Sequence, residues 1–308
     1  MAASHHKAAR SINMSDPNGK GKEVYLSSSA EYDSDSDSSS SSDYESARPS
    51  LSPFAQAQLL AARSISENQQ ISSTFLAKDA LLLDFACGTG ALSQRLASRV
   101  DIILGIDVDA GAVQQFNSRA RNQGIDEDEM CAIHCDILTE ESLVRAKAWF
   151  GKVDVIASAM GFHHLRDMAA VTKILVDRFL KADGWIAVVD LMHTPYTNAI
   201  FANAKKAMAS HPDKSRHGHD HLHQDAHHVG GIKAEDIRLA FESAGLDCVD
   251  IFEHVFDISV MVPRRLLPED YSSNEAGSSS NGQMLSAIPD GGKVEVLLPF
   301  LLAVGKKL

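Results

Sequence analysis

The sequence predicts an α/β fold built on a parallel, doubly wound sheet. Five short apolar runs, each typical of a buried strand, alternate with stretches in which apolar residues recur at helical spacing. Such alternation is the pattern of a parallel sheet with helices on both faces. A glycine turn directly after the first run, where a strand passes into a helix, also favours this class. The runs lie at 81–83, 102–106, 131–135, 152–160 and 186–191.

The composition sets limits on the function. The 308 residues suffice for one large domain or two small ones, and 44% hydrophobic residues allow a sizeable core. The formal net charge of −12 gives no indication of a basic surface for nucleic acid. Four scattered cysteines suggest reduced thiols, and no apolar run reaches the length of about 18 residues that a membrane span needs. We therefore expect a soluble, cytoplasmic protein that binds neither nucleic acid nor membrane.

The N-terminal residues 1–50 differ from the rest of the chain. They are rich in Ser, Asp and Gly and include the run DSDSDSSSSSDYES at 33–46. A segment of this composition buries too little apolar area to offset the entropy lost on ordering, so we expect it to be disordered. It serves either as a solvated spacer or as an acidic tail for phosphorylation. Residues 51–308 are expected to form a single domain, which begins with one or two helices in 54–76.

The stretch 81–97, LLLDFACGTGALSQRLA, has the layout of a cofactor loop. A buried strand passes through Gly88-Thr89-Gly90 into a helix, and glycines at such a turn allow positive φ and let a ligand approach the backbone. The N–H groups at the start of the following helix can bind an anionic group. A dinucleotide fingerprint would need a third glycine where Ser93 stands, and it would not include Asp84 ahead of the glycines. The turn by itself leaves the cofactor open.

Two later acids repeat the position of Asp84. Asp107 follows the strand 102–106, and Asp136 follows the strand 131–135. Because ligands of open α/β sheets bind outside the carboxyl ends of the strands, these three side chains are expected to line one site. An acidic rim complements a ligand with positive charge and repels a pyrophosphate. The three acids therefore favour a cationic cofactor over a dinucleotide.

The motifs resemble those of class I S-adenosylmethionine-dependent methyltransferases. The pattern D-x-x-x-G-x-G at 84–90 resembles their motif I, and Asp136-Ile137 resembles their motif II. The stretch 152–165, a strand that leads into a histidine pair, is similar to their motif IV. The segment 227–246 is similar to the C-terminal part of ubiquinone-biosynthesis-like members of this family.

The resemblance covers about residues 54–307 and implies a specific architecture. It implies a Rossmann-like, seven-stranded sheet of five parallel strands and a C-terminal hairpin, with helices on both faces. The stretches 247–262 and 294–304 alternate well enough to supply the two strands of the hairpin.

The resemblance also implies that S-adenosylmethionine is the cofactor. The motif residues would contact the three parts of this molecule: the methionine moiety (Asp84, Gly88, Gly90), the ribose (Asp107) and the adenine (Asp136, Ile137). The carboxylate of Asp107 can accept hydrogen bonds from both ribose hydroxyls. The remaining residues expected at the cofactor are Ala86, Cys87, Val108 and Ala159.

A histidine pair, His163-His164, follows the fourth strand. In the motif that it resembles, either histidine would orient the acceptor or remove its proton, so both are candidate catalytic residues. Capping of the next helix by a polar side chain is the alternative. The candidate acceptor contacts outside the pair are Phe162, His193 and His228.

The segment 193–230 is expected to form a lid over the substrate. It contains seven histidines in the eighteen residues 211–228. A His-rich run can bind metal ions, but the spacing H-x-H-x-H-x-H lacks the helical i, i+4 pair of a zinc-enzyme motif. We predict no functional metal site. A second long polar segment, 263–292, is expected to be a flexible loop.

Together these features predict a methyltransferase that transfers a methyl group to a small organic molecule by in-line displacement. The histidine motif at 162–165 departs from the N/D-P-P-Y sequence of adenine and glutamine methylases, which argues against a nucleic-acid acceptor. The alternatives are a protein methyltransferase, a catalytically silent fold that binds partners and, in third place, a dehydrogenase. The sequence predicts neither the identity of the acceptor nor the oligomeric state.

Overall fold

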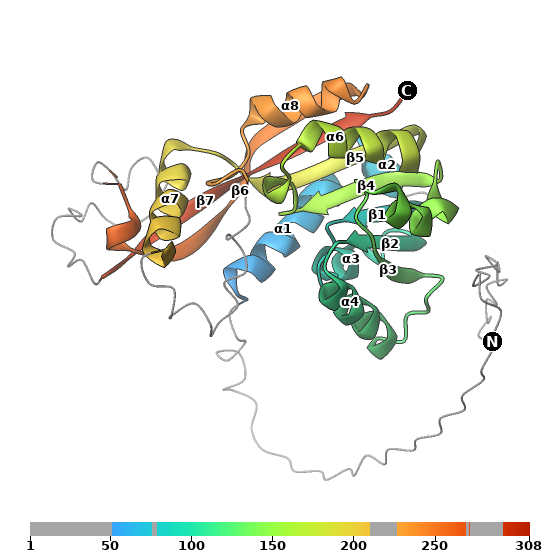
Figure 1. The fold of residues 1–308 in the computed structure, drawn as a ribbon, viewed down its shortest axis with the longest axis horizontal. Helices are drawn as coiled ribbons and strands as arrows, with labels where there is room; N and C mark the ends of the chain where they lie inside the picture. Colours follow the sequence, from blue (N-terminus) through green and yellow to red (C-terminus); the bar gives the residue numbers. More distant parts are fainter. Residues whose placement is uncertain (1–50, 76–78, 210–226, 269–270, 272–291) are drawn as a thin grey trace, which may run out of the picture. The chain divides into compact units, whose positions relative to one another are not determined.

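Five parallel strands and an antiparallel pair form one sheet (Figure 1). The computed structural model describes residues 51–75, 79–209, 227–268, 271 and 292–308. The predicted tail, 1–50, lies outside the described residues, as do residues 210–226 of the predicted lid and most of the predicted loop 263–292. The single domain predicted over 51–308 stays a prediction.

The five parallel strands lie where the apolar runs predict them. They are β1 (Leu81–Phe85), β2 (Ile102–Asp107), β3 (Met130–His134), β4 (Val153–Ala159) and β5 (Leu180–Leu191). Only β5 differs clearly, since it begins at Leu180, ahead of the predicted Ile186. Leu180 pairs with Val153, and the pairing with β4 is irregular before it resumes at Trp185.

The predicted C-terminal hairpin is present. β6 (Asp247–Pro263) and β7 (Lys293–Lys306) are antiparallel to each other, and β7 pairs with β5. The strand order is therefore β3-β2-β1-β4-β5-β7-β6. The confirmed architecture is a Rossmann-like α/β sheet in which the carboxyl ends of all five parallel strands meet at one edge.

Helices cover both faces of the sheet (Figure 1). None of them, within the described part of the chain, is long and apolar enough to cross a membrane. Asp109 caps α4 (Ala110–Asn122), because its Oδ1 accepts hydrogen bonds from the N–H groups of Gly111 and Ala112 at 2.7 and 3.1 Å. The helices are α1 (Pro53–Glu67), α2 (Ser72–Phe75), α3 (Ala91–Leu96), α4 (Ala110–Asn122), α5 (Glu140–Leu143), α6 (Met168–Ile174), α7 (Pro195–Ala209) and α8 (Ala234–Ser243), with 3-10 turns at 144–149, 162–164 and 264–266 and a π-helical turn at 175–179.

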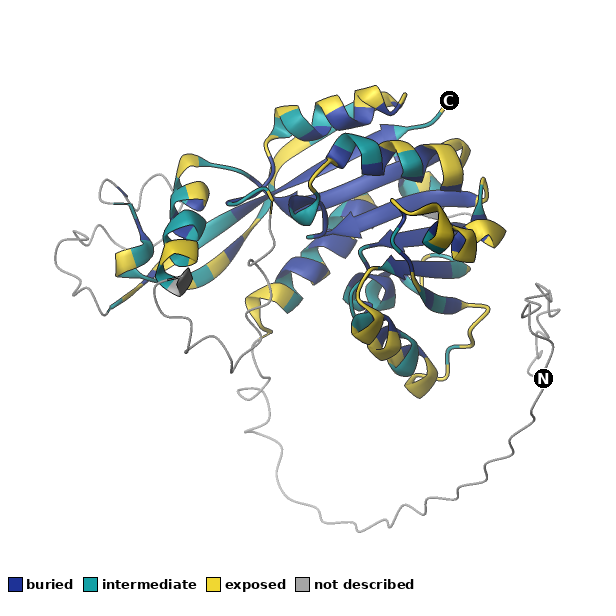
Figure 2. Cartoon of the chain, viewed as in Figure 1, coloured by how far each residue is buried: buried dark blue, intermediate teal, exposed yellow. Residues whose placement is uncertain are grey.

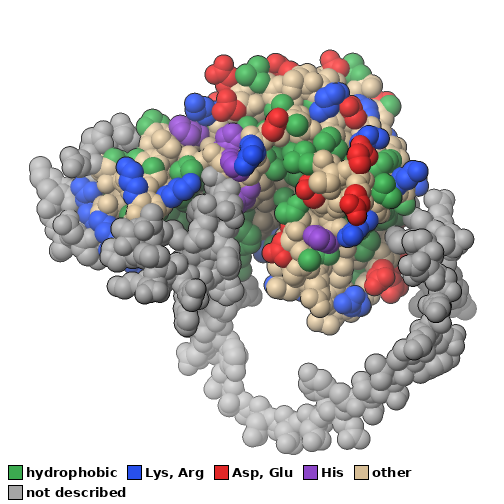
Figure 3. All heavy atoms as spheres, viewed as in Figure 1, with side chains coloured by type: hydrophobic (Ala, Val, Ile, Leu, Met, Phe, Trp, Pro, Cys, Tyr) green, Lys and Arg blue, Asp and Glu red, His purple; other side chains and the backbone are tan. Residues whose placement is uncertain are grey.

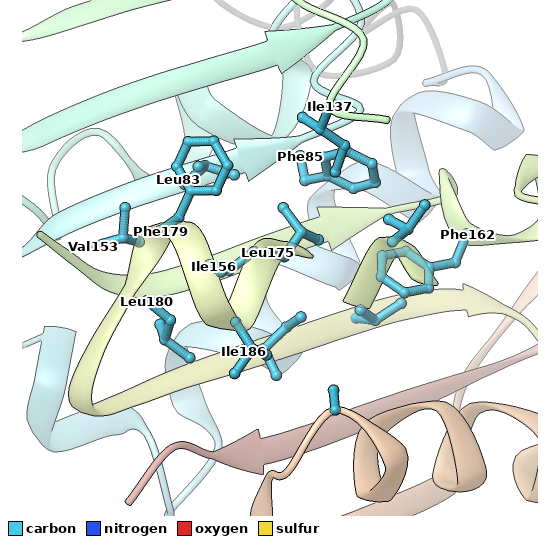
Figure 4. Packing of buried hydrophobic residues seen from close by; sticks show 14 of the residues in the cluster. Leu83, Phe85, Ile137, Val153, Ile156, Phe162, Leu175, Phe179, Leu180 and Ile186 are labelled. Atoms are coloured by element: carbon cyan, nitrogen blue, oxygen red, sulfur yellow. The ribbon is translucent and has the colours of Figure 1, made fainter. Parts of the chain in front are cut away.

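The apolar core lies on both faces of the sheet. Figure 2 shows the central strands as buried, and every residue of β1 and β4 is buried. Phe85, Phe162 and Phe179 belong to the cluster on the face of α6 and α8 (Figure 4). The cluster on the opposite face includes residues of α1, α3 and α4. Because successive strand residues point to opposite faces, Asp84 faces α3 whereas Phe85 faces α6.

A third, smaller cluster supports the outer part of the hairpin. β6 and β7 pair as far as Pro263 and Lys293, and α7 packs on this extension. The phenol of Tyr196 on α7 donates a hydrogen bond of 2.9 Å to the carbonyl of Leu297 on β7. The buried members of this cluster are Ile200, Val262, Leu267, Tyr271, Val294 and Val296.

Gly105 on β2 lets the glycine turn approach the sheet. A Cβ at this position would lie 2.8 Å from Cys87 Sγ and 2.9 Å from Ala132 Cβ. Since the core has no space for this methyl group, Gly105→Ala should lower the free energy of unfolding by about 1–3 kcal/mol, measured by urea denaturation. Gly111→Ala is the control: a Cβ there would meet an oxygen of the exposed Asp109 side chain at 3.2 Å and no core atom, so it should cost less stability than Gly105→Ala. Equal stability of Gly105→Ala and the wild type would contradict the close packing.

Candidate active site

The glycine turn between β1 and α3 holds three residues in the left-handed region. Ala86, Gly88 and Gly90 have φ angles of +56°, +51° and +87°. Gly90 leaves no room for a side chain, since a Cβ there would lie 2.6 Å from the ring of Phe116. At Gly88 a Cβ would meet nothing within 4 Å. One side of the turn is therefore packed against α4, while the backbone at Gly88 is open to a ligand.

The carboxylate of Asp107 fixes this turn to the end of β2. Its Oδ2 accepts a hydrogen bond from the N–H of Gly88 (2.7 Å), and its Oδ1 accepts one from the N–H of Asp109 (2.8 Å). The N–H of Cys87 donates to the carbonyl of Ile106 at 3.2 Å. The side chain of Cys87 lies in the core, where burial raises the pKa of its thiol. Cys87 therefore offers its backbone, and not a reactive thiolate, to the site.

Asp84 is a buried acid with a local hydroxyl donor. Its side chain faces α3, where Ser93 Oγ donates a hydrogen bond of 2.6 Å to Asp84 Oδ2. Only 1% of Asp84 is exposed. Burial raises the pKa of this carboxyl to about 7, although the hydrogen bonds from Ser93 lower it. Ser93 stands where a dinucleotide fingerprint would have its third glycine, and in the structure it is the hydrogen-bond partner of Asp84.

The third acid, Asp136, lies just beyond β3. Its Oδ1 accepts a hydrogen bond from the N–H of Leu138 at 3.0 Å, and its own N–H donates to Ser142 Oγ at 2.9 Å. Ile137 is buried in the core together with Phe85 (Figure 4). Val108, which follows β2, is 66% exposed. Of Val108 and Ile137, both predicted at the cofactor, only Val108 presents an open apolar surface.

The histidine pair lies beyond the end of β4. Ala159 is the last residue of β4, and Met160 turns the chain with a φ of +60°. The rings of His163 and His164 lie with their centroids 4.1 Å apart. His163 is only 4% exposed, and its carbonyl accepts a hydrogen bond of 3.0 Å from the N–H of His228. Figure 3 shows histidine side chains gathered on the viewed face.

Asp190 on β5 is a candidate functional residue that the sequence analysis missed. It is fully buried, and its Oδ1 lies 2.7 Å from His163 Nδ1. Its carboxylate also accepts hydrogen bonds from the N–H groups of Phe162 (2.9 Å), His163 (3.1 Å) and Leu191 (2.7 Å). Burial alone would lower the pKa of His163, but the charge and hydrogen bond of Asp190 outweigh it and raise that pKa. A charged residue inside an apolar strand was the signal that could have found it.

A family profile described as a methyltransferase domain matches residues 76–242, more than half of the chain. The chain belongs to this family. The class I membership predicted from the motifs is thereby confirmed, and the sheet has the class I methyltransferase fold. The ubiquinone-biosynthesis-like subtype stays a prediction.

Curated relatives agree with this assignment. The chain is 29% identical to an uncharacterized methyltransferase of Schizosaccharomyces pombe over 179 residues, which cover 55% of this chain and 54% of that one. It is 28% identical to an uncharacterized methyltransferase of Mycobacterium tuberculosis over 120 residues, which cover 39% and 55%. The chain thus spans about half the length of the curated relatives it matches.

Two solved structures share the fold. The YcgJ protein of Bacillus subtilis superposes with a TM-score of 0.53 at 15% identity and covers 77% of this chain and 95% of that one. A protein of Bacillus halodurans, provisionally named a methyltransferase, superposes with a TM-score of 0.50 at 15% identity and covers 78% and 97%. At such identities the similarity shows the fold alone.

Within the methyltransferase domain, Phe162 is placed differently from the prediction. It is fully buried, and its ring packs edge-on against Phe85 with the centroids 6.0 Å apart (Figure 4). Its predicted contact with the acceptor came from its place in the stretch that resembles motif IV, 152–165. The 3-10 turn at 162–164 instead directs its ring into the core, where it has no exposed surface for an acceptor.

The segment 227–232 lies beside the histidine pair, since the N–H of His228 donates to the carbonyl of His163. The N–H of Ile232 donates to the carbonyl of Leu191, and the N–H of His193 donates to the carbonyl of Ile232. With the bond between His228 and His163, these contacts bring both ends of the predicted lid to the carboxyl end of β5. Its middle, 210–226, lies outside the described residues, so the lid and the acceptor contacts of His193 and His228 stay predictions.

Metal binding is not indicated by the described side chains. In the part of the chain that the structure describes, no group of three or more His, Cys, Asp and Glu side chains is placed to hold a metal ion. Five of the seven histidines in 211–228 fall in the undescribed stretch 210–226. The predicted absence of a functional metal therefore stays a prediction.

The raised pKa of Asp84 should make stability depend on pH. Its value is about 7 in the folded protein against an ordinary value of 3.8, so the folded state binds the extra proton between these values. Stability contributed by this group is present at low pH and is lost as pH rises through that range. Asp84→Asn has no carboxyl group to titrate, so its free energy of unfolding should not show this loss. The free energy of unfolding of Asp84→Asn minus that of the wild type should therefore rise by on the order of 2 kcal/mol between pH 5 and pH 8.

Urea unfolding at both pH values measures this difference. Asp128→Asn, which changes an exposed acid before β3, is the matched control and should follow the wild type at both pH values. If Asp84→Asn and the wild type keep a constant difference from pH 5 to pH 8, the buried carboxyl does not titrate in this range.

Proposed function

We propose that this protein is an S-adenosylmethionine-dependent methyltransferase whose acceptor is a small organic molecule. The observation that carries the proposal is the arrangement of Asp84, Asp107 and Asp136 at or just beyond the carboxyl ends of the neighbouring strands β1, β2 and β3, around a glycine turn with open backbone at Gly88. A sulfonium and an ammonium group suit such an acidic rim, whereas a pyrophosphate does not.

The residues present fit this cofactor. Gly88 and Gly90 would let the methionine moiety approach the backbone, and Asp84 lies beside them as a buried acid. Asp107 uses one acceptor position on each oxygen for Gly88 and Asp109, which leaves further lone pairs for the ribose hydroxyls. Asp136 would lie near the adenine. The further cofactor contacts proposed are Ala86, Cys87, Val108, Ile137 and Ala159, of which Cys87 and Ile137 would act through their backbone.

S-adenosylmethionine, when bound, would supply a methyl group on a positively charged sulfur, open to in-line displacement by a lone pair of the acceptor. The protein has to hold the two molecules in line and exclude water. His163 would take the proton that the acceptor releases, with His164 orienting the acceptor. Asp190 would position His163 by holding its Nδ1.

The burial of His163 favours a small acceptor. His163 is 4% exposed and lies between Asp190 and the returning segment 227–232. An acceptor atom must therefore enter the protein interior to reach it. A small molecule can do this as a whole, whereas a folded protein would have to insert an extended side chain. A protein acceptor is the alternative.

A labelling experiment tests the proposal. The full chain is incubated with S-adenosylmethionine that carries a labelled methyl group and with a cell extract separated into small molecules and macromolecules. Label in a product of the small-molecule fraction is the expected result. Label confined to proteins would favour the alternative acceptor, and label in neither fraction would contradict methyl transfer.

Asp107→Ala should weaken binding of S-adenosylhomocysteine. The substitution removes the acceptor for two ribose hydroxyls and the bond that holds Gly88, and hydrogen bonds to a charged group contribute about 1.5–3 kcal/mol each. We therefore expect an affinity loss of at least about tenfold by calorimetry. Asp128→Ala, which removes an exposed acid before β3, should bind like the wild type. Unchanged affinity of Asp107→Ala would count against its role.

Asp190→Asn should lower the pKa of His163, because it removes the charge that raises this pKa. The midpoint of the His163 ring titration, followed by NMR, should move to lower pH. The rate of methyl transfer should fall at low pH, where His163 is protonated, and this fall should move to lower pH together with the titration. Asp154→Asn is the control: Asp154 is a buried strand acid at the opposite end of β4, where it accepts a hydrogen bond from the N–H of Leu81. An unmoved titration in Asp190→Asn would show that Asp190 does not set the state of His163.

A further inference from the structure

Gln58 on α1 has a buried side-chain amide in which, as far as the structure describes the chain, the nitrogen has a hydrogen-bond partner and the oxygen does not. It is 6% exposed, and its Nε2 lies 3.5 Å from the carbonyl of Ala159, at the limit of a hydrogen bond. Its Oε1 is buried and has no hydrogen-bond partner among the described residues. A buried acceptor without a partner costs free energy, so folded proteins seldom keep one without a reason.

The position of Gln58 connects it with the glycine turn. Asp84 on β1 pairs with Ala157 on β4, two residues before Ala159. Two residues beyond Ala159, a Cβ at Gly161 would lie 2.6 Å from the Cβ of Ala86 in the glycine turn. Ala157 and Ala159 belong to the same apolar cluster as residues of α1, and α1 packs against both α3 and β4 (Figure 1). Gln58 therefore reaches the point where the end of β4 meets the glycine turn.

The anchoring of α1 supports this placement. Arg95 on α3 reaches the carbonyl of Ala55 at 3.5 Å, and Ala55 lies one turn before Gln58 on the same helix. Ser52 caps the helix, since its Oγ accepts a hydrogen bond of 3.2 Å from the N–H of Ala55. Gln58 is thus held on a fixed helix and not on a loop.

We propose that Gln58 binds the ammonium group of the cofactor's methionine moiety. Its Oε1 would accept one N–H of the ammonium, and the carbonyl of Ala159 would accept another. An ammonium group has three donors and no acceptor, so it matches a site with two neutral oxygens and, on the neighbouring strand, the acid Asp84, which pairs with Ala157 two residues before Ala159. The inference rests on the proposed function and adds to it a residue from outside the motifs.

Two ligands separate this role from a structural one. S-adenosylhomocysteine contains the amino-acid part, whereas 5′-methylthioadenosine has the same adenosine and a thioether but no amino-acid part. In Gln58→Leu the affinity for S-adenosylhomocysteine should fall by about tenfold or more, as for loss of a hydrogen bond to a charged group. The affinity for 5′-methylthioadenosine should stay within about twofold of the wild type. Calorimetry on the full chain measures both.

Gln56→Leu is the matched control on the same helix. The amide of Gln56 donates to the carbonyl of Leu51 and does not reach the sheet, so both affinities should be unchanged. Gln58→Glu, which keeps an oxygen at this position and adds charge, should retain the affinity for S-adenosylhomocysteine. If Gln58→Leu does not fold, Gln58→Met can replace it in both titrations, because methionine has a volume similar to that of glutamine and no amide.

The outcomes distinguish this inference from the proposed function. If the wild type binds S-adenosylhomocysteine and Gln58→Leu loses affinity for both ligands equally, or for neither, the ammonium contact is wrong and the proposed function stands. If the wild type binds neither ligand, the proposed function and this inference are both wrong.

Discussion

The hydrogen bond from Gly88 to the carboxylate of Asp107 is the interaction on which the candidate site depends. It joins the turn after β1 to the end of β2, and the second oxygen of the same carboxylate holds the start of α4 through Asp109. The packing of Gly90 against Phe116 closes the turn from the other side. The left-handed backbone of the turn is thus held before any ligand arrives, which reduces the ordering cost of binding.

The two fully buried acids of the sheet are satisfied in different ways, and this difference separates their roles. Asp190 receives three N–H donors and a histidine, so its charge is stabilised inside the protein. Asp84 receives the hydroxyl of Ser93, and burial raises its pKa to about 7. A cation bound beside Asp84 would supply the missing stabilisation of its charge. Asp190 is therefore suited to positioning His163, whereas Asp84 is suited to binding a cation.

Features encoded locally were predictable from the sequence. The parallel strands follow from short apolar runs, and the acids Asp84, Asp107 and Asp136 follow from their places at or just beyond the ends of those runs. The cap of α4 by Asp109 is likewise a local pattern. The early start of β5 was not predicted, since it depends on pairing with the distant start of β4.

Contacts between distant segments account for what the sequence analysis missed at the site. Asp190 and His163 are 27 residues apart, and Gln58 and Ala159 are 101 apart. The sequence also did not reveal the direction of a side chain. The predicted acceptor role of Phe162 did not take into account the 3-10 turn that directs its ring into the core. Ser93 was interpreted only as an absent glycine, because its bond to Asp84 depends on how α3 packs on β1.

The most direct test of a cofactor site for S-adenosylmethionine is calorimetric titration of the wild-type chain with S-adenosylhomocysteine and, separately, with NAD. The acids at or just beyond the ends of β1, β2 and β3 predict saturable binding of S-adenosylhomocysteine and none of NAD. Binding of NAD, or no binding of S-adenosylhomocysteine at millimolar concentration, would contradict this account.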